Sequence, residues 1–290
     1  MMPPLNTPVP VPPMDLRLGF DSGVVSMGSC FADEVGQRLQ QGGFEMELNP
    51  FGILYNPASV ASALERLVDD REVTDADLVQ HEGLWHSWHH HGSFSCPTKE
   101  DTLELCNNRI HNAHKALKAA RLLMLTFGTA WVFELASGEV VANCHKLPAP
   151  MFKHRMMTVG EIVSLWKPLL EKLAGFNSRL TTLFTVSPIR HLADGAHGNQ
   201  ISKSTLLLAV DHLISLLNSR LPIYYFPAYE IVLDELRDYR FYGSDMTHPS
   251  ALAVDVVYDR FQQACMTPEV IQQAHNNAKQ FKRQQHIPLH

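Results

Sequence analysis

Short apolar segments alternate along this chain with amphipathic stretches of helical period. Strands that are apolar on both sides and joined through helices form parallel sheets covered on both faces. The sequence therefore predicts an α/β protein in three layers, α/β/α, around a mostly parallel sheet. The expected strands are 24–27, 44–48, 122–127, 180–186 and 223–226.

The remaining pattern gives the expected organisation of the domain. The proline-rich residues 1–17 predict an extended amino-terminal arm, because proline resists both helix and sheet. Residues 18–290 are expected to form a single domain, with insertions near 70–100 and 131–155. Helices are expected at 31–41, 58–68, 101–121, 158–174, 203–220, 229–236, 249–265 and 268–282, and hairpins at 81–94 and 131–144.

The composition argues against several classes of function. A net charge of −6 argues against binding of nucleic acid or an anionic membrane surface. No apolar stretch reaches the length of a bilayer span, and the first residues lack the pattern of a secretory signal. The five scattered cysteines lack zinc-site spacing and suit a reducing compartment. We expect a cytoplasmic protein with no membrane or nucleic-acid partner, and its oligomeric state stays open.

A candidate nucleophile stands where the first strand ends. Gly28 permits a tight turn, and Ser29 and Cys30 follow it at the carboxyl edge of the predicted sheet, where such sheets bind ligands. Either side chain needs a base to act near neutral pH. Asp245 and His248 are three residues apart, so the imidazole is the expected base and the carboxylate its orienting partner. The alternative is a helix cap with a histidine packed beside it.

These residues belong to longer motifs that resemble the GSCFA family. The signature run is Met27–Ala32, and further matching segments are 49–57, 126–131, 143–146, 187–191, 194–195, 199, 202–203 and 245–250. The resemblance extends over residues 20–265. The family is similar to SGNH/GDSL hydrolases, carbohydrate acyl-esterases and acyltransferases. It therefore implies an SGNH-hydrolase-like (flavodoxin-like) fold.

The resemblance also implies an activity. The expected reaction is hydrolysis of small acyl esters, of acetyl type and including those of carbohydrates, by a Ser/Cys-His-Asp mechanism. An acyltransferase on the same scaffold and a non-catalytic ligand-binding module are the alternatives. No cofactor is implied, and glycine-rich phosphate motifs are absent from the sequence.

The chain departs from the SGNH pattern at the nucleophile. SGNH proteins carry Gly-Asp-Ser, with serine third, whereas here Cys30 is third and Ser29 second. Cysteine is the stronger nucleophile once ionised, and a helix amino terminus lowers its pKa. Serine is the usual choice for ester chemistry. The sequence favours Ser29 and leaves Cys30 open.

A second departure concerns the oxyanion hole. The resemblance places one donor at Gly52, but Ala130 stands where SGNH hydrolases carry the asparagine that supplies another. Asn143 is the expected replacement, although a turn residue is an equally good interpretation of it. Asn49 and Asn56 are weaker candidates.

The expected substrate contacts come from several other segments. Arg190 could clamp an anionic group of the substrate, although an ordinary surface ion pair explains it as well. Asn199 and Lys203 are expected at the start of a helix, where an asparagine or a serine would serve as the cap. The other expected contacts are Gly128, Thr129, His145, Lys146, His191 and His90.

A histidine tract offers a rival interpretation, a metal-dependent hydrolase. The tract comprises His81, His86, His89, His90 and His91. Three consecutive histidines cannot all face one point on a strand. An aromatic, histidine-lined wall of the substrate pocket is the favoured interpretation, so no metal is expected.

Overall fold

The computed structural model describes residues 7–285. Its centre is a five-stranded sheet in the order β10-β9-β5-β1-β2, and every neighbouring pair is parallel. Counted along the chain, this order is 2-1-3-4-5, that of flavodoxin-like doubly wound folds. The predicted α/β fold with a mostly parallel sheet is confirmed. The strands are β1 (Val24–Gly28), β2 (Met46–Leu48), β5 (Leu122–Phe127), β9 (Thr181–Val186) and β10 (Ile223–Tyr225).

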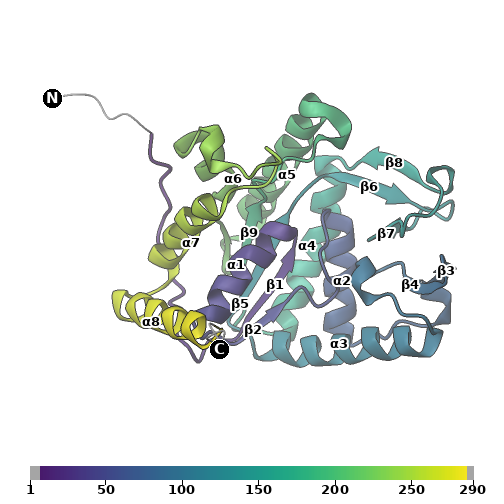
Figure 1. Ribbon diagram of the computed structural model, residues 1–290, viewed down its shortest axis with the longest axis horizontal. Helices are drawn as coiled ribbons and strands as arrows, with labels where there is room; N and C mark the ends of the chain where they lie inside the picture. Colours follow the sequence, from purple (N-terminus) through teal and green to yellow (C-terminus); the bar gives the residue numbers. More distant parts are fainter. Residues whose placement is uncertain (1–6, 286–290) are drawn as a thin grey trace, which may run out of the picture.

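Helices cover both faces of this sheet (Figure 1). Successive side chains of a strand point to opposite faces, and each face has its own apolar core. In β5, Leu123 and Leu125 join one core, whereas Leu122 and Met124 join the other. The first face carries α2 (Pro57–Asp69), α3 (Lys99–Ala119), α4 (Val159–Phe176) and α5 (Gly195–Leu217), and the second carries α1 (Cys30–Gln41), α7 (Ala251–Cys265) and α8 (Pro268–Gln285).

Two expected helices differ from those observed. The sequence predicts a helix from residue 203, but α5 begins at Gly195. Glycines 195 and 198 are weak helix formers, so the helical pattern becomes visible only further along. Asn199 therefore lies inside the helix instead of at its start. The expected helix at 229–236 is a single turn, α6 (Ala228–Glu230), followed by a π-helix, η5 (Ile231–Glu235).

Smaller elements lie outside the main sheet. The hairpin expected at 81–94 lies earlier in the chain, as β3 (Leu78–His81) with β4 (Leu84–Ser87), and the one expected at 131–144 appears as β6 (Trp131–Glu134) with β7 (Val140–Val141). A third strand, β8 (Lys153–Met156), pairs with β6; its polar sequence gave no strand signal. The 3-10 turns are η1 (Asp75–Asp77), η2 (Gly92–Phe94), η3 (Ala149–Met151), η4 (Leu192–Asp194) and η6 (Tyr239–Phe241).

The described part of the predicted arm packs along α7. Residues 7–18 form no helix or strand. The amides of Met14 and Leu18 donate to the carbonyls of Ala264 and Cys265 at 2.9 and 2.7 Å. Residues 1–6 of the predicted arm lie outside the described residues. Between residues 7 and 285, no helix combines the length and the apolar character needed to cross a membrane.

Candidate active site

Gly28 ends β1 in a conformation that favours glycine. Its φ is +140°, and a β-carbon there would lie 2.1 Å from the carbonyl oxygen of Thr126. Its N–H donates to Oδ1 of Asn49 at 3.0 Å. The strand therefore stops at this glycine, and the chain enters α1 at once with Ser29 as the N-cap.

Ser29 and Cys30 occupy different environments. Ser29 is fully buried, and its Oγ accepts a hydrogen bond from the N–H of Phe31 at 3.3 Å. Cys30 is the first residue of α1 and is partly exposed, with its Sγ 3.8 Å from the hydroxyl of Tyr55. Burial and, secondly, this thiol raise the pKa of Tyr55 to about 12. Of the two side chains, only that of Cys30 is therefore accessible from solvent.

Asp245 and His248 form a preassembled pair. Nδ1 of His248 lies 2.6 Å from Oδ2 of Asp245, whose Oδ1 accepts the N–H groups of His248 and Thr247 at 3.0 and 2.9 Å. These hydrogen bonds hold the pKa of Asp245 well below its usual range. Ser250, and not Asp245, caps α7. The N–H of Arg190, in the loop after β9, donates to the carbonyl of Thr247 at 3.1 Å, which ties the pair to the carboxyl edge of the sheet.

His191 lies beside the turn after β1. A β-carbon on Gly128 would be 3.0 Å from Nε2 of His191 and 3.4 Å from Cβ of Ser29, so the three residues converge. Nε2 is shielded from solvent and has no hydrogen-bond partner within the described residues. Burial, with smaller contributions from the charges of Lys203 and His248, lowers the pKa of His191 to about 4.

Lys203 joins two strand ends beneath the site. Its Nζ donates to the carbonyls of Gly128 and Ser187 at 2.6 and 2.7 Å. Only 1% of the residue is exposed, and burial lowers its pKa to about 7. The neighbouring Ser202 hydroxyl accepts the N–H of Ala130 at 2.7 Å. Lys203, expected only at the start of a helix, therefore links the ends of two strands. Sequence reasoning missed this role, and the only signal for it was the place of Lys203 in a family motif.

The loop between β2 and α2 uses its polar groups internally. The N–H of Gly52 donates to the carbonyl of Asn49 at 2.7 Å, so this amide is already engaged. The Asn49 side chain holds Gly28, as described above. Asn56 is the N-cap of α2 and accepts the N–H of Ser59 at 2.8 Å. Gly52, Asn49 and Asn56 therefore stabilise the conformation of this loop, and we do not include them in the proposed oxyanion hole.

Residues 143–146 pack against β4. Oδ1 of Asn143 accepts the N–H of His145 at 2.8 Å. Nε2 of His145 lies 2.9 Å from the carbonyl oxygen of Ser87, and its ring stacks on His86 with centroids 4.5 Å apart. Burial lowers the pKa of His145 to about 4. Lys146 follows in a left-handed conformation, with φ +59°. We place these residues in the support of the hairpin and not at the nucleophile.

The histidine tract also makes structural contacts. His90 is fully buried and stacks on Phe51 at 4.4 Å, so no surface of it faces a substrate. His89 lies 2.9 Å from Asp77, and the N–H of His91 donates to the carbonyl of Phe51 at 2.9 Å. Within residues 7–285, no group of three or more His, Cys, Asp or Glu side chains is placed to hold a metal ion. The tract supports the loop that carries Phe51.

Gly128 and Thr129 lie at the predicted edge of the site. Both amides donate to the carbonyl oxygen of Tyr55, at 2.8 and 2.9 Å. The Thr129 hydroxyl lies 3.0 Å from that of Ser202. The Cα of Gly128 therefore faces Ser29, whereas the side chain of Thr129 points toward Ser202 on α5.

The chain belongs to the GSCFA family, whose profile matches residues 23–261. This match confirms the resemblance carried by the motifs. No curated protein sequence matches the chain.

Several solved esterase structures resemble the chain at low identity. A family 3 carbohydrate esterase from Clostridium thermocellum is 8% identical with a TM-score of 0.39, covering 83% of this chain and 92% of that one. A family 3 carbohydrate esterase from Talaromyces cellulolyticus is 7% identical with a TM-score of 0.41, covering 88% and 99%. An acetyl xylan esterase from Butyrivibrio proteoclasticus is 9% identical with a TM-score of 0.41, covering 89% and 66%.

Proposed function

We propose that this protein hydrolyses small acyl esters of acetyl type, with a nucleophile at the start of α1, His248 as the base and Asp245 as its orienting partner. The Asp245–His248 pair is the observation that carries the proposal. Its 2.6 Å hydrogen bond occupies Nδ1, and Nε2, which has no partner between residues 7 and 285, can exchange protons. The N–H of Arg190 ties the pair to the loop after β9, at the carboxyl edge where open parallel sheets bind their ligands.

We place the nucleophile at Cys30 and give Ser29 the role of helix cap, the reverse of the preference from the sequence. The hydroxyl of Ser29 is buried and already holds the amide of Phe31. The thiol of Cys30 is partly exposed at the amino terminus of α1. Ser29 remains the alternative, because its β-carbon is close to Gly128 and hence to His191.

The proposed reaction has two steps. The sulfur of Cys30 attacks the carbonyl carbon, and His248 takes the thiol proton; the bond to the alcohol oxygen then breaks, and the alcohol leaves with that proton. Water, deprotonated by His248, next attacks the thioester and releases the carboxylic acid and the free thiol. If another alcohol takes the place of water, the same intermediate gives acyl transfer.

Two donors are proposed for the oxyanion. Within the described residues, the backbone N–H of Cys30 has no hydrogen-bond partner, as expected in the first turn of a helix. The second donor is Nε2 of His191, which is also unpartnered there and lies beside Gly128. With a pKa of about 4, His191 is neutral at pH 7 and can donate a proton carried on Nε2. It supplies the donor that Ala130 cannot.

The test is hydrolysis of a short-chain aryl acetate by the wild type and by variants at three positions. We expect His248→Ala and Cys30→Ala to lose activity by roughly 10²–10⁴-fold, as for loss of a base or nucleophile. Ser29→Ala should keep most activity and lose about 1 kcal/mol of stability, and Ser29→Gly should restore most of that stability.

Loss of activity in both Ser29 variants with retention in Cys30→Ala would move the nucleophile to Ser29. Equal activity in all variants, or none in the wild type, would contradict the proposed hydrolysis. It would instead favour a binding module, which the missing asparagine at Ala130 also suggests.

A further inference from the structure

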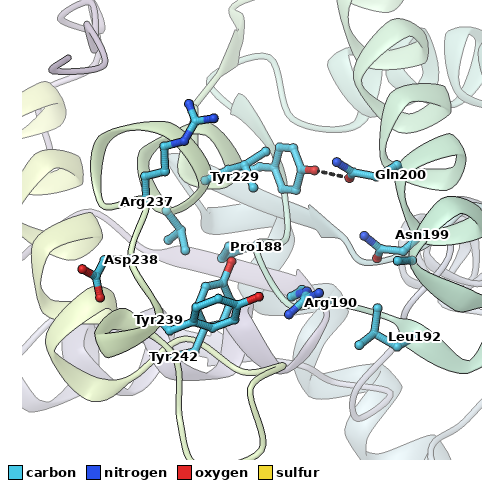
Figure 2. Close-up of a pocket in the computed structure, with 13 residues that line it drawn as sticks. Pro188, Arg190, Leu192, Asn199, Gln200, Tyr229, Arg237, Asp238, Tyr239 and Tyr242 are labelled. Carbon is cyan, nitrogen blue, oxygen red and sulfur yellow. Dashed lines mark hydrogen bonds between the residues drawn. The ribbon is translucent and has the colours of Figure 1, made fainter. Parts of the chain in front are cut away.

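A cavity of about 330 Å³ lies next to the loop that carries the Asp245–His248 pair. Its walls come from the loop after β9, the first turns of α5 and the segment from α6 to residue 242 (Figure 2). The volume lies at the lower end of the range for small-molecule sites. The cavity therefore has room for a compact ligand such as one sugar ring.

The cavity shares walls with the proposed catalytic pair. Arg190 lines it and donates from its guanidinium to the carbonyl of Met246 at 3.0 Å. On another wall, Tyr242 precedes Gly243, whose N–H donates to the carbonyl of His248 at 2.7 Å. A ligand held in the cavity would thus lie next to the loop that carries the base.

Arg190 gives the cavity an uncompensated positive charge. Its guanidinium lies 5.9 Å from the ring centre of Tyr242. Among the described residues, no carboxylate comes within ion-pair distance of it. Asp238, which also lines the cavity, is held by Arg240 at 3.0 Å, and Arg237 lies 3.8 Å from Asp234. Nη1 of Arg190 is engaged with Met246, but Nε and Nη2 have no hydrogen-bond partner among the described residues, and this edge of the guanidinium matches one planar carboxylate.

The other walls suit a ring that carries hydroxyl groups. Tyr229, Tyr239 and Tyr242 present aromatic surface, and 67% of Tyr239 is exposed. The hydroxyl of Tyr229 donates to Oε1 of Gln200 at 2.7 Å, which leaves the amide nitrogen of Gln200 free (Figure 2). Oδ1 of Asn199 is likewise engaged, with the N–H of His191 at 2.9 Å, and its amide nitrogen is free. Aromatic faces with a few polar groups favour a sugar over a purely apolar acid.

We propose that this cavity binds a sugar residue that carries a carboxylate, with the carboxylate on Arg190 and the ring against the tyrosines. The sugar would be the alcohol part of the acylated substrate, a point that rests on the proposed function. Recognition of the free sugar acid does not depend on catalysis, so it can be measured separately.

The experiment is an NMR titration of the full chain at low ionic strength with methyl glucuronoside, methyl glucoside and glucose 6-phosphate. We expect the glucuronoside to bind at least about tenfold more tightly than the glucoside. Of these two ligands, only the glucuronoside can make charge-assisted hydrogen bonds with the guanidinium of Arg190. Arg190→Gln should abolish this preference. Arg190→Lys keeps the charge without the fork and should retain part of it. The matched control is Arg220→Gln, an exposed arginine just beyond α5, which should behave as the wild type.

Equal affinity for glucuronoside and glucoside would overturn the proposal, as would a preference that survives in Arg190→Gln. Binding of the phosphate but not of the glucuronoside would overturn the assignment to a carboxylate. Thermal melting of each variant shows whether it is folded. If Arg190→Gln does not fold, Arg190→Lys still tests the proposal.

A second measurement separates this inference from the proposed function. Turnover of an acetylated methyl glucuronoside is compared with that of an aryl acetate. Binding of the glucuronoside without any ester hydrolysis would support the cavity and refute the hydrolase. Hydrolysis of the aryl acetate without binding of the glucuronoside would support the hydrolase and refute the proposed role of the cavity.

Discussion

Replacement of Lys203 by methionine should destabilise the protein, and more strongly at higher pH. The ammonium group is buried and donates to the carbonyls of Gly128 and Ser187. Methionine fills a similar volume but leaves both buried oxygens without this donor. An unpaired buried polar group costs about 1–3 kcal/mol, so the loss should reach about 2–6 kcal/mol where the wild-type lysine is neutral.

The pH dependence follows from the lowered pKa of Lys203, about 7 in the fold against 10.5 when unfolded. Between these values the unfolded chain binds the extra proton, so wild-type stability rises with pH. Below pH 7 both states are protonated, and the cost of burying the charge is fully present. Integrated from pH 7 to 9, the wild type should gain about 2 kcal/mol relative to Lys203→Met.

Urea unfolding of both proteins at pH 7, 8 and 9 measures this difference, and other titrating groups cancel in the comparison. Lys167→Met, at an exposed site on α4, is the matched control and should show no such trend. A constant difference between wild type and Lys203→Met across this range would refute the reasoning about the buried amine.

Variants at three further positions test the site, one of them with a matched control elsewhere. Asp245→Asn should lower kcat/KM in aryl acetate hydrolysis by roughly 10³–10⁴-fold with little change in Tm, because the amide cannot stabilise the imidazolium; a change below tenfold would count against the pair. His191→Ala should lower kcat by about 10²–10³-fold with KM nearly unchanged, and His191→Gln should restore part of kcat because its amide can donate a hydrogen bond. Equal kcat in the wild type and both variants would remove His191 from the oxyanion hole. Gly28→Ala should fail to fold, since its β-carbon would lie 2.1 Å from the Thr126 carbonyl, whereas Gly138→Ala, also at positive φ but with open space around it, should fold with a slightly lower Tm. A soluble Gly28→Ala protein with wild-type Tm would contradict this account of the turn.

The sheet was predictable because its signal is local. Each strand is a short apolar run between turn residues, and burial on both faces requires such runs. The strand at 122–127 is observed with the predicted bounds. The polar strand β8 was missed because it is stabilised by pairing with β6 and not by an apolar face. The early start of α5 was missed because glycines obscure its first turns.

The candidate site was only partly predictable. Asp245 and His248 are close in the sequence, so their pairing follows from spacing. Which of Ser29 and Cys30 is buried depends on how β5 packs beside the turn, and no sequence pattern reports that. The converging contacts of His191 and Lys203 join segments distant in the chain, and only the fold brings them together.

The central claim is that the turn after β1 forms an acyl intermediate with help from His248. The most direct test is to mix the protein with an aryl acetate, quench in acid and locate the acetyl group by peptide mass spectrometry. We predict an acetyl group on Cys30 that is absent in His248→Ala. No acetyl group at residues 29–30, or the same labelling in His248→Ala, would contradict the account.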